Sequence, residues 1–276
     1  MNQKRSFFLF SLSVFLLLSM LFSCEGDDGI KTLDLGNGVS LKLIKVKAGR
    51  FQMGSPKDEL GRFDDENQHW VTLTKDYWLG ETEVTQGQWK AVMWYNPSRC
   101  KNGDDYPVEM VSNGDAVTFC EQLNKRYRGQ LPKGYQFSLP TEAQWEYACR
   151  AGTTSSLNSG KNITLEKGSC PNLDEVGWYR ENTERSHCPV RQKRPNAWGF
   201  YDMHGNVQEW CSDRYGDYSG DTTDPKGASN SFRWVYRGGS WRDNARYCRA
   251  ANRSGKYSSD RSHDYLGFRL ALVPVQ

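Results

Sequence analysis

The sequence predicts an α+β domain rich in loops, and three features of the 276-residue chain lead to this prediction. Helical periodicity is rare, because apolar residues recur at helical spacing in only three segments. Short segments of alternating polar and apolar residues, which are typical of strands, surround these three. Elsewhere Gly, Asn, Asp, Ser and Trp alternate without a period. So much irregular chain needs hydrogen bonds, disulfides or metal to fix it, because its backbone groups cannot pair in ladders.

Three helices are predicted from their apolar faces and from the residues at which they begin. The first covers residues 86–92 behind a candidate cap at Thr85. The second follows Asn113 or Asp115 and runs through residue 124. The third covers residues 141–149, where the sequence Thr-Glu-Ala-Gln is typical of a helix start.

Short strands are predicted in four segments, at residues 41–46, 70–73, 234–237 and 268–273. Beyond residue 40 no Pro/Ser-rich linker or block of like charge divides the sequence, and no internal repeat is visible. We therefore expect a single domain over residues 41–276, which is within the size range of one irregular domain.

The first 23 residues have the features of a secretory signal peptide. Lys4 and Arg5 precede an apolar run over residues 7–22, and the small Ser23 comes directly before Cys24. Residues 21–24 resemble a bacterial lipobox, in which the Cys is acylated and becomes the new N-terminus. An ordinary cleaved signal with an incidental Cys is the alternative.

The segment after Cys24 is interpreted as a lipid anchor followed by a tether over residues 24–40. Two or three acyl chains, at about 0.8 kcal/mol for each buried CH2, would hold the protein on a membrane. Residues 25–29 are short, acidic and flexible, and they resemble the surface-export signal of Bacteroidota lipoproteins. We expect an outer-membrane lipoprotein of the cell envelope, with surface exposure as a further alternative. The envelope is oxidising, so disulfides are allowed there.

The charge balance excludes two classes of protein. Removal of the predicted signal peptide takes away Lys4 and Arg5 and leaves 34 basic and 33 acidic side chains. This near-neutral balance gives no electrostatic footprint for nucleic acid. No later segment is long and apolar enough to span a bilayer. A nucleic-acid-binding protein and a multi-span transporter are therefore both excluded.

Six motifs occur in a fixed order along the chain: FQMGS at 51–55, ETEVT at 81–85, LPTEAQWEYA at 139–148, NAWGFYDMHGNVQEW at 196–210, RGGSW at 237–241 and LGFR at 266–269. Together they closely resemble the sulfatase-modifying-factor family, whose founding member is the formylglycine-generating enzyme. The resemblance runs from about residue 46 to residue 273. It implies a loop-rich variant of the C-type-lectin fold in a single domain.

The resemblance also implies a chemistry, which this sequence does not support. In the active enzymes two Cys thiolates hold Cu(I), and oxygen converts a cysteine of a sulfatase into formylglycine. The pair follows the Gly-Gly-Ser motif as G-G-S-x-x-C-x-x-x-x-C. Aligned here without gaps, Asp243 takes the first position and Cys248 the second. A carboxylate is a hard ligand and a poor replacement for a thiolate on Cu(I).

A second alignment, which matches residues 249–253 to the family's R-x-A-A-R, leaves Cys248 outside both copper positions as a structural half-cystine. Both alignments remove at least one copper thiolate, so we do not expect copper. We expect a non-catalytic binding or scaffold module that keeps the family's peptide groove. The alternative is an oxidase acting on sulfatase cysteines, in which Cys248 would be the catalytic residue.

Calcium is the metal that the resemblance favours. In the enzymes the matching segment winds around a structural Ca2+ through two side-chain oxygens and two backbone carbonyls. Carried over by position, these are the side chains of Asp202 and Glu209 and the carbonyls of Gly205 and Val207. Hard oxygens suit Ca2+, and Gly205 permits a tight turn. A turn held by hydrogen bonds alone is the alternative.

Seven cysteines remain after Cys24 is assigned to lipid, at positions 100, 120, 149, 170, 188, 211 and 248. An odd number leaves at least one without a partner in the chain. The resemblance implies a bond between Cys149 and Cys248, and Cys211 competes as the partner of Cys248. A bond between Cys170 and Cys188 would close one irregular excursion. The family partner of Cys120 would fall at Leu270, so Cys120 is predicted to be a buried thiol.

The remaining candidates are histidines and aromatic residues. The four histidines, His69, His187, His204 and His263, have no metal-ligand spacing and are interpreted as surface or packing residues. Nine aromatic residues lie in predicted loops: Trp70, Trp78, Trp94, Tyr95, Trp178, Tyr179, Trp198, Tyr215 and Tyr218. They either fill the core or bind a peptide, a glycan or an envelope protein, because a flat ring buries area with little entropy lost.

Overall fold

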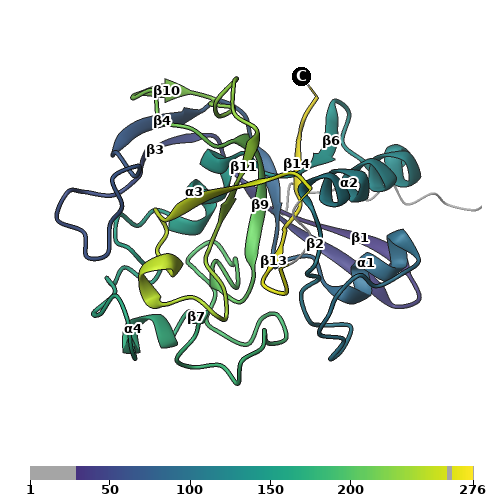
Figure 1. Ribbon diagram of the computed structural model, residues 1–276. Helices are drawn as coiled ribbons and strands as arrows, with labels where there is room; N and C mark the ends of the chain where they lie inside the picture. Colours follow the sequence, from purple (N-terminus) through teal and green to yellow (C-terminus); the bar gives the residue numbers. More distant parts are fainter. Residues whose placement is uncertain (1–28, 260–262, 276) are drawn as a thin grey trace, which may run out of the picture.

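The computed structural model describes residues 29–259 and 263–275 of the chain. They form one α+β domain with few helices, four small sheets and long loops (Figure 1). The predicted signal peptide and Cys24 lie outside the described residues. Within the described residues, the structure has no helix with the length and apolar character that crossing a bilayer requires.

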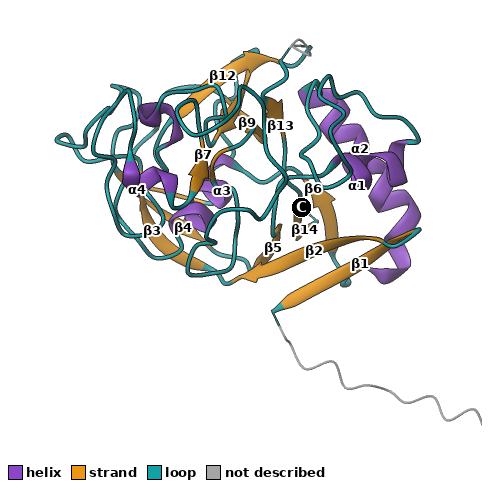
Figure 2. Ribbon diagram, turned by 90° about the horizontal axis from the view of Figure 1, so that it is seen from below, coloured by secondary structure: helices purple, strands orange, loops and turns teal. Residues whose placement is uncertain are grey.

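The largest sheet is antiparallel and has the strand order β1-β2-β5-β14-β6. Its strands in that order are Ile30–Gly36, Val39–Val46, Tyr77–Gly80, Ala271–Pro274 and Tyr135–Ser138. The helices α1 and α2 lie beside this sheet (Figures 1 and 2). Between them is a core in which Trp89 of α1 stacks on Phe119 of α2 at 5.3 Å and meets Phe268 edge-on.

The strand β1 lies in the segment that was predicted to be a tether. Residues 30–36 pair with β2, and Leu33 and Leu35 alternate inward so that both side chains are buried in the core. The burial of these apolar side chains stabilises β1 in the sheet. The folded domain therefore begins by Ile30, and the predicted boundary at residue 41 is wrong for residues 30–40.

Three further sheets make up the rest of the domain. A four-stranded sheet has the order β12-β11-β9-β13, which are Arg253–Tyr257, Arg233–Arg237, Gln208–Arg214 and Leu266–Gly267. A three-stranded sheet has the order β10-β4-β3, which are Thr222–Thr223, His69–Leu73 and Gly49–Met53. The strands β7 and β8, at Gly177–Trp178 and His204–Gly205, form a parallel pair.

The predicted strand at residues 268–273 is wrong in its extent. Only residues 271–273 of this segment are strand, as part of β14; β13 ends before the segment begins, and residues 268–270 belong to neither sheet. Arg269 is fully buried and pairs with Glu209, so its side chain enters the interior in the stretch between β13 and β14, which belong to different sheets. The sequence pattern gave no sign of the break, because Phe268 and Leu270 are also buried.

The three predicted helices are confirmed as α1, α2 and α3, at Gln86–Met93, Asn113–Tyr127 and Glu142–Arg150. Each begins with a capping box, in which the cap hydroxyl and the third helical residue bond to each other's backbone N–H. The caps are Thr85, Ser112 and Thr141, so α2 is capped one residue earlier than predicted. The structure also has two short 3-10 helices, at Arg128–Gln130 and Ala245–Cys248, and the one-turn helix α4 at Pro171–Asp174.

Loops cover much of the molecule on the side away from α1 and α2 (Figure 2). Five buried ion pairs join arginines to glutamates: Arg150–Glu146, Arg237–Glu146, Arg249–Glu66, Arg253–Glu142 and Arg269–Glu209. The same guanidinium groups donate hydrogen bonds to loop carbonyl oxygens, as Arg150 does to Ser155, Arg237 to Ala250 and Arg253 to Gly216. The irregular chain was predicted to need additional bonds, and among the described residues the guanidinium groups supply many of them.

Candidate functional site

An open cleft of about 710 Å³ lies against β9, β11 and β12. Its rings come from segments far apart in the sequence: Phe63, Tyr215, Tyr236, Tyr247 and Tyr265. Its charged groups have both signs: Asp64, Asp65, Asp243, Arg242, Arg253 and Lys256. A concave site with rings and charged groups is the common form of a binding site.

Asp243, which takes the first copper-cysteine position in the ungapped alignment, lines this cleft. Its Oδ2 accepts hydrogen bonds from Ser240 Oγ at 2.6 Å and from Gln208 Nε2 at 2.9 Å. Burial raises the pKa of the Asp243 carboxyl, and these two hydrogen bonds oppose the rise. These hydrogen bonds fix the carboxyl group in the wall of the cleft.

Cys248 does not line the cleft and is fully buried. Burial raises the pKa of its thiol well above the ordinary value. Its side chain packs with Cys170, Tyr179 and Ala245 in a small apolar cluster. This environment is that of a packing residue.

The seven cysteines in the described part of the chain are all free thiols. The ring of His204 contacts both cysteines of the family-derived pair: its Nε2 is 3.8 Å from Cys149 Sγ, and its Nδ1 is 2.7 Å from the Cys248 carbonyl. Cys248 shares its apolar cluster with Cys170, and Cys149 and Cys211 belong to a different cluster. The structure therefore contains none of the predicted disulfides, and their formation in the envelope stays a prediction. Cys120 is buried on α2, as predicted.

The segment predicted to bind calcium forms a tight turn before β9. Asp202, Gly205 and Asn206 all have positive φ, at 57°, 84° and 59°. A Cβ on Gly205 would lie 1.9 Å from the carbonyl oxygen of Trp178, so only glycine fits at this position. The turn brings Asp202 and Glu209 into the same buried region as Arg269.

Three carboxylates share this region with one guanidinium, because the fully buried Glu83 also lies there. Glu83 accepts hydrogen bonds from Val207 N and Asn206 Nδ2. Burial raises its pKa well above the ordinary value, and the charges of Asp202 and Glu209 raise it further. Burial also raises the pKa of Asp202 to about 6.

The residues present fit a hard cation at Asp202. Its Oδ2 accepts a hydrogen bond from Arg191 N, whereas its buried Oδ1 has no partner among the described residues. Glu209 is less available, because its two oxygens accept hydrogen bonds from Arg269 and from Trp145 Nε1. A buried carboxylate oxygen without a partner is a suitable ligand for Ca2+.

The histidines differ in their surroundings. His204 is fully buried and bonded at both nitrogens, since Nε2 accepts from Asn158 N at 2.9 Å and Nδ1 faces the Cys248 carbonyl. Its pKa is lowered to about 4 by burial. The ring of His69 contacts that of Tyr218 in a tilted arrangement, with the ring centroids 4.5 Å apart, and these two histidines are packing residues as predicted. His187 is different, because it lies beside Cys100 and Glu109 without a hydrogen bond to either ring nitrogen.

Sequence reasoning missed most of the residues that form the cleft. Of the nine loop aromatics, only Tyr215 lines it; Trp78 and Tyr179 are buried in the core, and Trp94 is 81% exposed elsewhere. Phe63 and Tyr247 lie almost two hundred residues apart, and no local signal joins them. Glu83 and Arg269 were also missed as partners, although each stands in one of the quoted motifs, ETEVT and LGFR.

The structure is a loop-rich α+β domain with an open cleft. Residues 39–273 match the family model described as the sulfatase-modifying factor enzyme 1-like domain. The chain therefore belongs to the formylglycine-generating-enzyme-like family, as the six motifs predicted. This confirms the predicted family and the predicted fold class.

Several curated relatives are similar over much of the chain. A chaperone protein named LppX from Paenibacillus barcinonensis is 31% identical over 247 residues, covering 74% of this chain and 79% of the relative. The formylglycine-generating enzyme of Bos taurus is 34% identical over 196 residues, covering 66% of this chain and 49% of the enzyme. The chain thus aligns with only about half the length of that enzyme. The inactive C-alpha-formylglycine-generating enzyme 2 of the same species is 27% identical, covering 92% of this chain and 94% of the relative.

A solved structure supports the fold. The variable protein 1 of Treponema denticola superposes with a TM-score of 0.77 and 30% sequence identity. The match covers 89% of this chain and 99% of that one. The family thus includes proteins that carry the name of the enzyme and proteins that are named for other roles.

Proposed function

We propose that this protein is a lipid-anchored envelope protein whose cleft binds an extended peptide segment of another protein without changing it chemically. One observation carries the proposal. Asp243 stands in the cleft at the first copper-cysteine position, and Cys248 is buried in an apolar cluster outside the cleft. A soft ion that requires two thiolates has no such pair at this place.

The wall of the cleft supports a peptide as the occupant. Tyr247 is 37% exposed and the Arg242 side chain is 54% exposed, so a ring and a cation are available to a ligand. Arg253 is held by Glu142 through two hydrogen bonds of 2.8 and 2.7 Å, which makes it a fixed part of the wall. Rings with charges of both signs suit a polypeptide, which has apolar side chains and charges of both signs.

The lipid anchor rests on the sequence around Cys24, and a binding role is in keeping with a relative that is named a chaperone. The site at Asp202 is proposed to hold a structural Ca2+, with the Gly205 and Val207 carbonyls and Glu209 as the other ligands. There the ion would compensate the excess of buried carboxylates around Arg269.

A copper experiment tests the absence of catalysis. The mature chain is titrated with Cu(I) against a competing chelator and then supplied with oxygen and a cysteine peptide of the sulfatase type. We expect no thiolate-dependent copper binding in the cleft and no oxygen uptake. Oxygen consumption that disappears in Cys248→Ser would contradict the proposal and favour the oxidase.

A photo-crosslinking experiment tests the binding role. A photoreactive phenylalanine analogue replaces Tyr247 in the cleft, and a matched variant carries it at Phe232, which is 79% exposed and does not line the cleft. Irradiation of the native envelope is expected to give a discrete protein adduct from position 247 alone. A glycan adduct from position 247, or the same products from both positions, would overturn the peptide assignment.

A further inference from the structure

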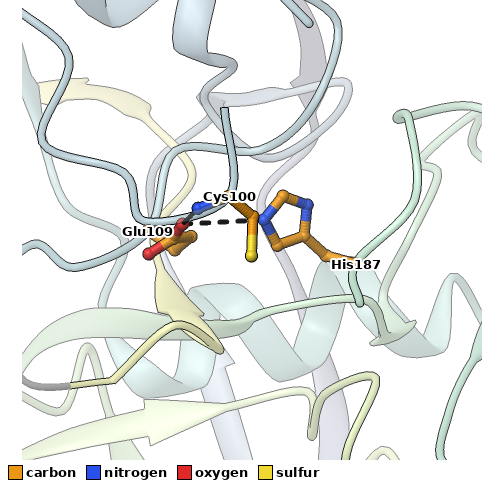
Figure 3. Close-up of side chains that lie close together, drawn as sticks. All are labelled: Cys100, Glu109 and His187. Carbon is orange, nitrogen blue, oxygen red and sulfur yellow. Dashed lines mark hydrogen bonds and ion pairs between the residues drawn. The ribbon is translucent and has the colours of Figure 1, made fainter. Parts of the chain in front are cut away.

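Cys100, Glu109 and His187 come together from three irregular segments of the chain. Cys100 follows α1, Glu109 precedes α2, and His187 lies in the loop after β7. One ligand atom from each, a sulfur, a carboxylate oxygen and an imidazole nitrogen, lies within 4.8 Å of the other two. Figure 3 shows the imidazole facing the carboxylate with the thiol beside them.

Two of the three side chains are buried, and three of their polar atoms have no hydrogen-bond partner among the described residues. Glu109 is fully buried and His187 is 2% exposed. Glu109 Oε2 and both ring nitrogens of His187 have no hydrogen-bond partner among the described residues. The distance from His187 Nε2 to Glu109 Oε1 is 3.7 Å, which is too long for a hydrogen bond. Buried polar groups in folded proteins are nearly always hydrogen-bonded, so three unsatisfied atoms around one point call for an additional partner.

The surrounding structure holds the three residues in place without using these atoms. Cys100 N donates to Glu109 Oε1 at 2.8 Å, and Gln86 Nε2 donates to the Cys100 carbonyl at 2.8 Å. The ring of His187 meets Tyr106 edge-on at 5.7 Å. The backbone of Cys100 and the orientation of the imidazole are therefore fixed by other contacts, which is the preorganisation that a metal site needs.

We propose that Cys100, Glu109 and His187 bind a zinc ion. Thiolate, imidazole and carboxylate together are the ligand types that Zn2+ takes in proteins, and three protein ligands leave a fourth tetrahedral position for water. Ca2+ and Mg2+ prefer oxygen ligands only, and a single thiol does not provide the pair that Cu(I) selects. None of the three residues belongs to the turn at Asp202 or lines the cleft.

The ion would cross-link the segment around Cys100 to the loop around His187. This cross-link would stabilise residues at one edge of the cleft. Arg99, next to Cys100, contacts Asp264 at 3.2 Å, and Arg242 of the cleft contacts the same carboxylate at 3.7 Å.

Cobalt substitution tests the site in the full mature chain. The protein is freed of metal by a chelator and titrated with Co2+, and the absorption spectrum is recorded. We expect intense visible bands of tetrahedral Co2+ and a near-ultraviolet sulfur-to-cobalt band at one ion per chain, both removed by Zn2+. Cys100→Ser is expected to lose the sulfur band. Glu109→Gln and His187→Gln are expected to weaken binding by more than about tenfold, since even the loss of an outer-shell partner has such an effect.

Cys188→Ser is the matched control, because Cys188 is half-buried, directly follows His187 and does not belong to the cluster. This variant should keep the full spectrum. The proposal is overturned if the wild type gives no sulfur-to-cobalt band, or if Cys188→Ser loses the band and Cys100→Ser keeps it. If Cys100→Ser does not fold, the Co2+ affinity of His187→Gln tests the site instead. An affinity equal to that of the wild type would overturn the proposal.

Discussion

Single arginine side chains replace much of the hydrogen bonding that this loop-rich chain lacks. Arg237 is fully buried, pairs with Glu146 and donates hydrogen bonds to the carbonyl oxygens of Ala250, Ala251 and Asn252. A guanidinium has five donors in a fixed plane, so one residue can satisfy several loop carbonyls at once. This explains why a polar chain with short sheets can hold long loops in one conformation.

Removal of one such arginine should be strongly destabilising. Arg237→Met leaves Glu146 without one of its partners and three carbonyls without a donor, so we expect a loss of about 3–5 kcal/mol in the free energy of unfolding. Urea denaturation measures it. Arg99→Met is the control, because Arg99 is exposed and its pair with Asp264 should contribute less than about 1 kcal/mol. Equal losses for the two variants would contradict this account of the loops.

Asp213 should make stability depend on pH. It is 2% exposed, and burial together with the charge of Glu142 raises its pKa from 3.8 to about 7. Between these two values the folded chain keeps a proton that the unfolded chain releases. The contribution of this group to stability is therefore complete below about pH 4 and falls as the pH rises to about 7.

The variant Asp213→Asn isolates this contribution, since an amide does not titrate. The free energy of unfolding of the wild type minus that of the variant should become smaller between about pH 4 and pH 7. Denaturant unfolding at several pH values measures the difference. A difference that stays constant across that range would show that Asp213 titrates alike in both states.

At the scale of elements, the turn between β8 and β9 depends on one glycine. Gly205→Ala would place a Cβ 1.9 Å from the Trp178 carbonyl oxygen at a φ of 84°. We expect a loss of more than about 3 kcal/mol, because the left-handed backbone contributes roughly 1–2 kcal/mol and the overlap adds to it. Thermal unfolding measures the loss. Gly160→Ala is the control, because its φ is 80° and nothing lies within 4 Å, so only the backbone effect should remain.

The sequence was sufficient for those elements whose signals are local. The helices α1 and α3 begin directly after their caps, Thr85 and Thr141. These starts were predictable because a capping box lies within four residues. The strand β1 was missed, since its role depends on pairing with β2 and the acidic residues before it favoured a tether. The break between β13 and β14 was missed because Arg269 is buried by a partner 60 residues away in the sequence.

The site was predictable only where a motif carries it. The position of Asp243 followed from the Gly-Gly-Ser motif, and its place in the cleft agrees with that alignment. The group of Cys100, Glu109 and His187 was not predictable, because 78 residues separate the last two and neither spacing matches a metal motif. An odd number of cysteines was the only sequence sign that one thiol has a separate role.

At the scale of the whole molecule, buried charge is unevenly distributed. Glu83, Asp202 and Glu209 surround one guanidinium, that of Arg269, while the sequence as a whole is almost neutral. A calcium ion at the turn would remove this local excess and stabilise the segments that meet there. Ligand binding at 100 times its Kd adds about 2.7 kcal/mol to stability.

Calcium should therefore raise the melting temperature of the metal-free protein by roughly 5–10 °C, given a shift of about 2–4 °C per kcal/mol for a domain of this size. Calorimetry after chelation and after the addition of excess Ca2+ measures the shift. Asp202→Asn should abolish the response, and Asp213→Asn should keep it, because Asp213 contacts Glu142 and Ser212 and lies outside the turn. Cys100→Ser should still show the rise in melting temperature with Ca2+, which would distinguish the calcium site from the proposed zinc site. Equal melting temperatures with and without Ca2+ would mean that Arg269 and protonation balance the carboxylates alone.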